Sequence, residues 1–409
     1  MSSRKVALPQ EAQFQQVNRL VSSQQRLTTV YADTTAAVSS ASPVQLRVEL
    51  PKTGYLNPAQ SYFTVQVKVS SGATTTTECL KQGVMSAFRS CRVSIGGRLV
   101  EHITNAYIWS RMMFECLNGD DTTDNSAWMS GYDSAANRTA QQKDPVGEWV
   151  RYSFKIPSGL LSSQKLLPLW AMPQVAVEFE FNGSNEGVLV NSSNSDEEFS
   201  LRNLQYKAEL HDMSPEYNAA ILAQINSAEG LEVMFPSIEC HTRTLDTSTQ
   251  QNFEIASTVR SAKTLFLCQR ANSNISDVDA DYSFIRDSLD EVQLEIGSQV
   301  YPNIPTKTGS ESFAELQKAL KRQLGAEIPM SSISYSEYYS SGGKHFIGYD
   351  LERFLTQAAL SGQDLASHPL NVRLTFSAAP NATANRLYAF IVRDTILKIH
   401  ENHRIEVIY

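Results

Sequence analysis

Residues 91–100 read Cys-Arg-Val-Ser-Ile-Gly-Gly-Arg-Leu-Val, and residues 292–301 read Val-Gln-Leu-Glu-Ile-Gly-Ser-Gln-Val-Tyr. Both stretches alternate apolar and polar residues, the pattern of a β-strand that buries one face, and each breaks at a glycine. Ile95-Gly96 therefore lines up with Ile296-Gly297, one pair in each half of the chain. A strand that recurs in this way indicates an internal repeat.

Further matches follow in the same order along both halves. Residues 175–181, Val-Ala-Val-Glu-Phe-Glu-Phe, correspond to residues 370–376, Leu-Asn-Val-Arg-Leu-Thr-Phe. The alternating stretch 199–210 corresponds in the same way to residues 387–399. Because the order of elements is kept while the loops differ in length, we expect an all-β chain of two tandem antiparallel sandwiches.

Short helices accompany the strands. Apolar stripes at helical spacing predict an inserted helix over residues 105–118 and its counterpart over 310–324. Ser214 followed by Pro215 is a favourable helix start, with Ser as N-cap and Pro in the first turn. Residues 10–25 form an amphipathic N-terminal arm, which either caps its own domain or contacts a partner.

The chain is long enough for two domains. At 409 residues it exceeds the size of one ordinary hydrophobic core. We expect an N-terminal arm and linker, a first sandwich, a helical linker and a second sandwich, in chain order: residues 1–42, 43–213, 214–229 and 230–409.

Composition excludes several classes of function. The formal net charge of −8 argues against a dedicated nucleic-acid binder, which needs clustered Lys and Arg to neutralise phosphates. The five cysteines form no Cys-x-x-Cys pair and are odd in number, so we expect free thiols and folding in a reducing compartment. The N-terminus shows no signal-peptide pattern, and the sequence has no run of apolar residues long enough to span a bilayer.

The sequence predicts no catalytic, cofactor-binding or metal-binding residues. Of the seven histidines only His400 and His403 lie close together, and on a strand their spacing puts them on opposite faces. Glu178 and Glu180 share a strand face, which we expect to be solvated rather than an acid/base pair. Nucleophile elbows, dinucleotide-binding glycine motifs and P-loops are all missing from the sequence, so we expect no enzyme.

Aromatic residues are the remaining candidates for a ligand site. We expect three tryptophans to pack in cores: Trp109, Trp149 and Trp170. Trp128, in the polar stretch 119–147, is the tryptophan that we expect to be exposed, and it could contact a glycan. A second candidate is the tyrosine cluster that precedes two serines and two glycines: Tyr335, Tyr338 and Tyr339. These residues keep open an alternative function, a carbohydrate-binding or adhesin-like double β-sandwich.

The layout resembles the double jelly-roll major capsid proteins of icosahedral double-stranded DNA viruses. The resemblance covers nearly the whole chain and rests on the Ile-Gly strands described above, on the approach Pro168-Leu-Trp-Ala-Met-Pro173 to residues 175–181, and on the stretch from Tyr349 to Phe376. It implies two jelly rolls and a homotrimer, a pseudo-hexagonal block that tiles an icosahedral virion shell. The implied partners are neighbouring capsomers, minor capsid and penton proteins and, through the arm, an internal membrane, with no specific nucleic acid. The implied location is the virion, after synthesis in the host cytoplasm or nucleus.

Overall fold

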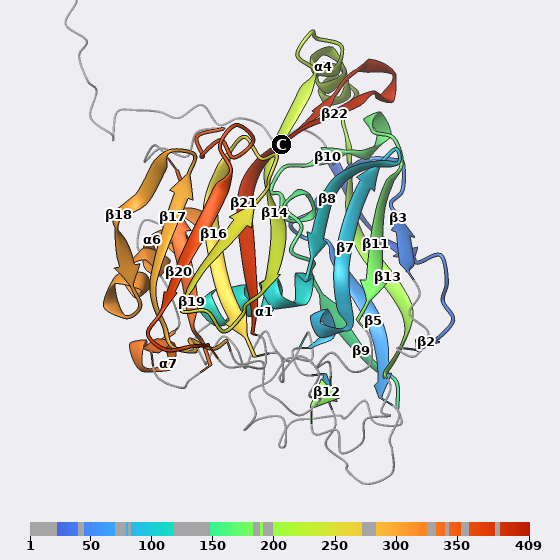
Figure 1. The fold of residues 1–409 in the computed structure, drawn as a ribbon. Coiled ribbons are helices and arrows are strands. Elements are labelled where there is room, and N and C mark those ends of the chain that lie inside the picture. Colours follow the sequence, from blue (N-terminus) through green and yellow to red (C-terminus); the bar gives the residue numbers. More distant parts are fainter. Residues whose placement is uncertain are drawn as a thin grey trace, which may run out of the picture.

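A computed structural model describes residues 23–39, 45–69, 79–80, 83–117, 129, 148–182, 189–190, 199–271, 284–324, 333–339, 343–352, 360–380 and 385–409. Its strands form two sandwiches that stand side by side, with the axes of most strands roughly aligned (Figure 1). The first sandwich lies on the right of that view and the second on the left.

The first sandwich consists of two antiparallel sheets. One has the order β3-β11-β7-β8, with bounds Leu46–Glu49, Val175–Phe181, Phe88–Ile95 and Arg98–Thr104. The other has the order β10-β4-β13-β5-β9, with bounds Leu167–Pro168, Tyr55–Leu56, Phe199–Met213, Tyr62–Val69 and Val150–Phe154. Strands β1 (Ser23–Tyr31) and β2 (Val38–Ser39) also pair with β13. A separate pair joins β6 (Cys79–Leu80) to β12 (Leu189–Val190).

The second sandwich repeats this arrangement. One sheet has the order β15-β20-β17-β18, with bounds Gln250–Ile255, Leu370–Phe376, Leu289–Ile296 and Gln299–Lys307. The other has the order β14-β21-β16-β19, with bounds Leu231–Thr244, Arg386–Ile399, Ala262–Arg270 and Phe346–Asp350. Strand β22 (Ile405–Ile408) pairs with β21. Each strand of β3-β11-β7-β8 thus has a counterpart in β15-β20-β17-β18, and β1-β13-β5-β9 corresponds to β14-β21-β16-β19, which confirms the internal repeat and the two predicted sandwiches.

The Ile-Gly stretches form the equivalent hairpins of the two sandwiches. Ile95 pairs with Arg98 across the turn between β7 and β8, and Gly96 and Gly97 have φ values of 60° and 80°. Ile296 pairs with Gln299 between β17 and β18, where Gly297 has φ 61°. Positive φ is costly for residues with a side chain, so glycine fixes both turns.

Three helices lie where the sequence predicts them. They are α1 (Ala106–Leu117), α4 (Pro215–Ile225) and α6 (Ser310–Leu324). Helix α4 begins as expected, because the Ser214 hydroxyl accepts a hydrogen bond from the Tyr217 backbone N–H and Pro215 occupies the first turn. The described residues also include the short helix α7 (Tyr335–Tyr339) and four 3-10 turns: Val84–Ala87, Leu160–Ser162, Leu169–Ala171 and Glu401–His403. Among the described helices, none combines the length and the apolar character that a bilayer crossing requires.

The sheet β14-β21-β16-β19 is buried on both faces. Alternate residues of β21 point to opposite sides: Leu387, Ala389 and Ile391 belong to the core between the second pair of sheets. Tyr388 and Phe390 belong instead to a cluster that continues into the core of the first sandwich. One continuous apolar core therefore joins the two sandwiches, and they cannot separate without exposing it to water.

Residues 23–31 correct our expectation for the N-terminus. We expected an arm and linker over residues 1–42, but Ser23–Tyr31 form strand β1, which pairs with β13 along its whole length. The sequence does not predict this strand, because its side chains are mostly exposed and it lacks the apolar alternation that marks the other strands. The rest of the predicted amphipathic arm, up to residue 22, lies outside the described residues.

Candidate functional site

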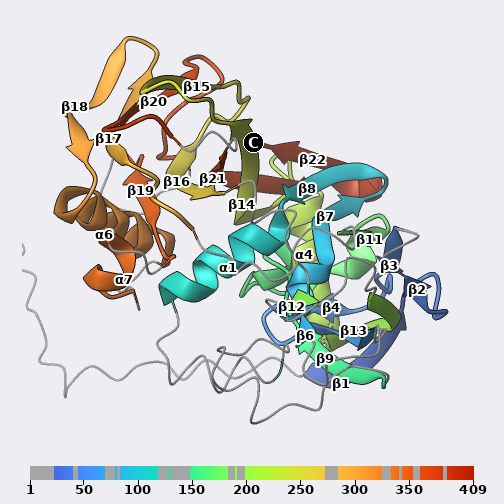
Figure 2. The same cartoon turned by 60° about the horizontal axis from the view of Figure 1, so that its bottom comes forward.

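The joint between the two sandwiches brings together residues that no pattern in the sequence marks. Trp109 on α1, in the first sandwich, packs against Phe266 on β16 and Phe390 on β21, with ring centroids 5.7 Å and 5.4 Å away. Figure 2 shows α1 running between the two halves of the molecule. The Trp109 side chain is only 4% exposed. The helix that recurs in the sequence therefore serves, in the first half, to attach one sandwich to the other.

Backbone meets backbone at a second point of the joint. Gly159, just before the turn Leu160–Ser162, lies so close to Pro236 of β14 that a Cβ atom on Gly159 would overlap the Pro236 carbonyl oxygen. The same added atom would lie 3.3 Å from the Phe235 ring. Gly159 has an ordinary helical φ of −66°, so glycine is required here by the close approach and not by the backbone conformation.

A buried carboxyl group positions the loop that carries Gly159. Glu101 on β8 is 1% exposed and accepts hydrogen bonds from the Ser158 hydroxyl, from the Gly159 N–H at 2.9 Å and from the Leu160 N–H at 3.3 Å. Burial raises the pKa of Glu101 to about 7, although these hydrogen bonds and the charge of Arg393 oppose the shift. The joint therefore contains a carboxyl group that titrates near neutrality.

Arg393 on β21 links β14 to the C-terminal residue. Its Nε donates to the Ser237 hydroxyl at 2.9 Å, its Nη1 lies 3.1 Å from Glu239 Oε2, and its guanidinium stacks 4.4 Å from the centre of the Tyr409 ring. Burial tends to raise the pKa of Glu239, but the hydrogen bond from His241 and the charge of Arg393 outweigh it and lower that pKa. The ion pair between Arg393 and Glu239 therefore lies at the edge of the apolar joint.

The C-terminal segment reaches from the second sandwich back to the first. The Tyr409 hydroxyl donates to the Leu99 carbonyl at 2.9 Å, and Arg98 donates to the Ile405 carbonyl at 3.2 Å. His403 Nδ1 lies 3.1 Å from the Ala171 carbonyl oxygen. These contacts join β22 to β8 and to the Leu169–Ala171 turn, so the C-terminus reinforces the joint.

The histidine pair lies in a turn and not on a strand as we expected. Strand β21 ends at Ile399, and the Glu401–His403 turn follows because Asn402 and His403 take left-handed conformations with φ 58°. His400 lies 3.7 Å from Glu406, while His403 faces Ala171. The part of the chain that the structure describes contains no group of three His, Cys, Asp or Glu side chains placed to hold a metal ion.

The two glutamates on β11 each have a partner on a neighbouring strand. Glu178 lies 3.5 Å from Arg47, and Glu180 accepts a hydrogen bond from Ser90 at 2.7 Å. They share the outer face of the sheet, as the period of two predicts, and both are half-buried. Because each carboxylate is engaged separately, the geometry offers no acid/base pair.

The tyrosine cluster is not the exposed loop that we expected. Tyr335–Tyr339 form α7, and Tyr338 is fully buried, where its hydroxyl donates to Ser312 at 2.9 Å and its ring packs on Phe313. Tyr339 is 44% exposed and lies under the Arg286 guanidinium at 4.6 Å. The other glycan candidate, Trp128, lies outside the described residues. Of Tyr338 and Tyr339, therefore, one ring is buried and the other is partly exposed.

The remaining tryptophans differ in burial. Trp109 is in the joint, and Trp170 is partly buried against the same core, as we predicted. Trp149 is half-buried and stacks under the Arg202 guanidinium at 4.1 Å. Trp149 thus packs on a cationic partner and lies outside both apolar clusters, which corrects its predicted place in the core.

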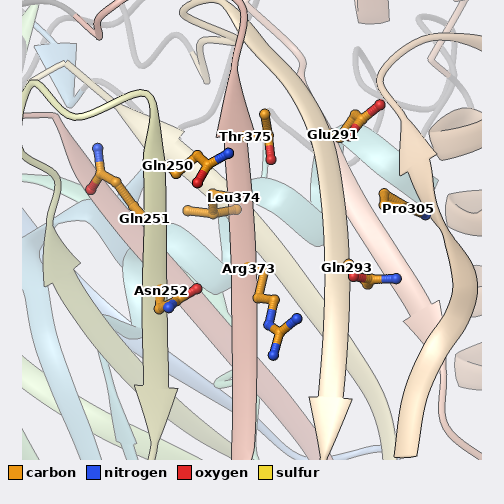
Figure 3. A pocket seen from close by; sticks show the side chains of 9 residues that line it. All are labelled: Gln250, Gln251, Asn252, Glu291, Gln293, Pro305, Arg373, Leu374 and Thr375. Atoms are coloured by element: carbon orange, nitrogen blue, oxygen red, sulfur yellow. The ribbon is translucent and has the colours of Figure 1, made fainter.

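The surface of the described residues includes two hollows lined by polar and aromatic side chains. One, of about 220 Å³, crosses β15, β20, β17 and β18 and is lined mainly by amide side chains together with Glu291 and Arg373 (Figure 3). The other, of about 590 Å³, lies between α4 and the first sandwich and includes Tyr55, Trp170 and Leu222. The residues that line these two hollows include no nucleophile paired with a base, which is the arrangement that covalent catalysis requires.

Comparison with known proteins identifies the fold. No family model and no curated protein matches the chain. The chain is similar to the Faustovirus major capsid protein, with 8% identity over 95% of this chain and 93% of that chain and a TM-score of 0.67. It is similar to VP54 of PBCV-1, fitted into a reconstruction of the virophage Sputnik, with 12% identity over 97% and 99% and a TM-score of 0.65. A third match is the mavirus major capsid protein, with 9% identity over 100% and 93% and a TM-score of 0.52. The chain has the double jelly-roll fold of these proteins over almost its full length.

Proposed function

We propose that this chain is a major capsid protein that self-assembles as a pseudo-hexagonal homotrimer and tiles an icosahedral virion shell. The observation that carries the proposal is the fusion of two equivalent jelly rolls into one block by a continuous apolar core. Three such blocks around a threefold axis present six similar edges, and a block with six similar edges can fill a hexagonal lattice with one repeated type of contact.

The rigidity of the joint supports a structural role. Shell subunits must keep the angle between their two jelly rolls fixed, because an error in that angle would be multiplied around the ring. Trp109, Gly159 and Tyr409 hold the joint at three separate places. Proteins named as major capsid proteins in Faustovirus and mavirus share the same doubled fold.

The proposal extends to partners and location. Neighbouring capsomers would bury large permanent interfaces of about 2,000 Å² or more each. Minor capsid and penton proteins would occupy the vertices, and the N-terminal arm would contact an internal membrane. The acidic net charge of −8 suits a shell that does not bind the nucleic acid of the genome directly. The chain would reside in the virion after synthesis in the host cytoplasm or nucleus.

The division of the chain is also part of the proposal. We keep the helical linker at residues 214–229 and the second jelly roll at 230–409. The first jelly roll, expected at 43–213, gains β1 (Ser23–Tyr31), because that strand is an edge of its larger sheet. The arm would then be limited to residues 1–22.

The native mass of the untagged protein is the first test. Light scattering should give a stable species of three times the chain mass of 45.4 kDa, and electron microscopy should then show hexagonal blocks or closed particles. A protein that stays monomeric at all concentrations and yields no particles would contradict the proposal. No described residue favours the carbohydrate-binding alternative specifically, and glycan binding by such a monomer would be the result that revives it.

A further inference from the structure

The hollow of about 590 Å³ between helix α4 and the first jelly roll, called the α4 groove below, has apolar side chains on two sides. On the side of the jelly roll lie Tyr55 and Trp170, whose rings meet edge to face with centroids 6.2 Å apart. On the other side lie Met213, at the end of β13, and Leu222 of α4. A groove of this size with an apolar lining can hold the side chains of a peptide segment.

Helix α4 carries more apolar residues than it buries. Its sequence is Pro-Glu-Tyr-Asn-Ala-Ala-Ile-Leu-Ala-Gln-Ile, yet of these residues only Ile225 is buried, and Leu222 is 46% exposed. Pro215, Ala219 and Leu222 follow one another at spacings of four and three, so they share one face, and that face lines the groove. Because a helix that is apolar on most sides is usually covered, we expect this face to have a partner.

The chain that precedes the described residues enters at the rim of the α4 groove. Strand β1 begins at Ser23, which is paired with Met213, the last residue of β13. The two strands are antiparallel, so the chain before Ser23 continues past the same end of the sheet from which α4 follows β13. Figure 1 shows α4 projecting beyond that end of the first jelly roll.

Arg26 of β1 attaches this end of the strand to the lining of the groove. Its Nε lies 3.4 Å from Asp212 Oδ2, and its Nη2 donates to Thr53 Oγ1 at 3.1 Å. Asp212 and Thr53 both line the groove. Ser23 comes three positions before Arg26, and three extended residues span about 10 Å. The segment before Ser23 therefore starts beside the groove.

The sequence of that segment predicts a helix that suits a groove. Its apolar residues recur at helical spacing, and they are Phe14, Val17, Leu20 and Val21. Gln15 and Arg19 fall on the opposite face of the same predicted helix. Amphipathic helices bind apolar grooves through anchors at such spacings. A helix over residues 10–22 would be about 20 Å long, so its anchors would stay close to the point where it starts.

We propose that residues 10–22 dock in the α4 groove of their own chain, with the apolar face of their predicted helix against Leu222 and Trp170. The same chain supplies the segment because Ser23 tethers it at the rim, and a short tether gives an effective concentration on the order of millimolar. This inference does not depend on the proposed function. It assigns to the amphipathic stretch the first of the two roles that its sequence left open, which is to cap its own domain.

The docking assigns the apolar and the basic residues of the arm to different surfaces. Arg4 and Lys5 precede the amphipathic stretch and take no part in the groove contact. A membrane contact of the arm would then depend on the attraction of these two charges to anionic lipid headgroups. The apolar anchors would be occupied by the groove.

Hydrogen exchange in the untagged chain tests the docking. The backbone amides of α4 should exchange at least about tenfold more slowly in the full chain than in a chain that lacks residues 1–22, because the docked segment hinders local opening of the helix. Val17→Asp should speed exchange as the deletion does, since it would bury a charge in the groove. Gln15→Asp is the matched control, which adds the same charge on the opposite face and should leave α4 as protected as in the wild type. The amides of β21, in the second jelly roll, serve as the internal reference that no variant should change.

A pair of cysteines identifies the chain that supplies the segment. Val17→Cys combined with Leu222→Cys should oxidise to a disulfide within one chain, so that the denatured protein runs as a monomer and peptide mapping finds the two cysteines joined. Gln15→Cys combined with Leu222→Cys is the control for a segment that merely reaches the groove, and it should cross-link at least about tenfold more slowly, because its side chain points away from α4.

Three results would overturn the docking. One is α4 exchange that the deletion leaves unchanged, and another is equal cross-linking from positions 15 and 17. The third is a disulfide that joins two chains, which would assign the groove to the arm of a neighbouring copy. None of these results touches the capsid proposal, which depends on the native mass and on the particles. A chain that forms neither trimers nor particles but shows the protection and the internal disulfide would overturn the capsid proposal alone.

Discussion

Gly159 of the first jelly roll touches the carbonyl oxygen of Pro236 in the second so closely that no Cβ atom fits between them. The two residues belong to different jelly rolls and are brought together only by folding. Backbone contact at this point fixes the separation of the two units, since protein interiors transmit strain and do not absorb it.

Gly159→Ala should destabilise the protein by at least about 3 kcal/mol, the upper range for forced overpacking, because the new methyl group can only be accommodated by moving Pro236 away. The free energy of unfolding from guanidinium denaturation measures the loss. Gly97→Ala is the control: Gly97 has open space around it, so only its φ of 80° opposes the change, and the cost should be about 1 to 2 kcal/mol. Equal losses for the two variants would show that the joint yields easily.

Trp109→Ala should cost about 3 to 5 kcal/mol, because it removes a buried ring from between Phe266 and Phe390. The wild type should unfold in one transition, and the variant should show separate transitions for the two jelly rolls. Trp149→Ala, at a half-buried ring that stacks on Arg202 outside the core, should cost only about 1 kcal/mol. A Trp109→Ala protein that still unfolds in one wild-type-like transition would contradict a joint held by this residue.

Glu101 should make stability depend on pH. Its folded pKa is about 7, whereas an unperturbed glutamate titrates near about 4.3. Between these values the folded state binds the proton more strongly than the unfolded state does. The stabilising contribution of Glu101 to the free energy of unfolding is therefore complete below about pH 4 and is lost as the pH rises through about 7. Above that pH the free energy of unfolding no longer changes because of Glu101. The effect should amount to a few kcal/mol, because each tenfold difference in proton affinity between the folded and unfolded states is worth about 1.4 kcal/mol.

Glu101→Gln isolates this contribution from the other carboxyl groups. Glu337, for example, has a pKa lowered to about 2 and acts in the opposite direction. The unfolding free energy of the wild type minus that of the variant should therefore fall between about pH 4 and pH 7. A difference that rises with pH would mean that Ser158, Gly159 and Leu160 hold the carboxylate ionised.

Truncation of the N-terminus should have two distinct effects. Removal of residues 1–22 leaves β1 intact and should give a folded trimer that assembles poorly into shells or binds an internal membrane less. Removal of residues 1–31 also deletes β1, which pairs with β13 over nine residues, and should lower the free energy of unfolding by at least about 2 kcal/mol. Thermal unfolding and light scattering distinguish the two cases. Loss of the trimer on the shorter deletion would place the arm within the block.

Most of the fold could be predicted from the sequence because the same order of strands recurs in both halves of the chain. The matching of Ile95-Gly96 to Ile296-Gly297 and of Val175–Phe181 to Leu370–Phe376 located equivalent strands, and periodicity located α1 and α6. Strand β1 was missed, since its exposed side chains carry no alternation. The stretch Leu387–Val392 does carry a signal of the joint: an uninterrupted apolar run indicates a strand buried on both faces.

The sequence by itself determined the two jelly rolls, since the period of two, the glycine turns and the helix start at Ser214 are local properties of neighbouring residues. Only the tertiary structure decided how the jelly rolls meet. The contacts of Trp109 with Phe390, of Gly159 with Pro236 and of Tyr409 with Leu99 join residues far apart in the chain. No local pattern marks such pairs, because each depends on where two separately folded surfaces come to lie.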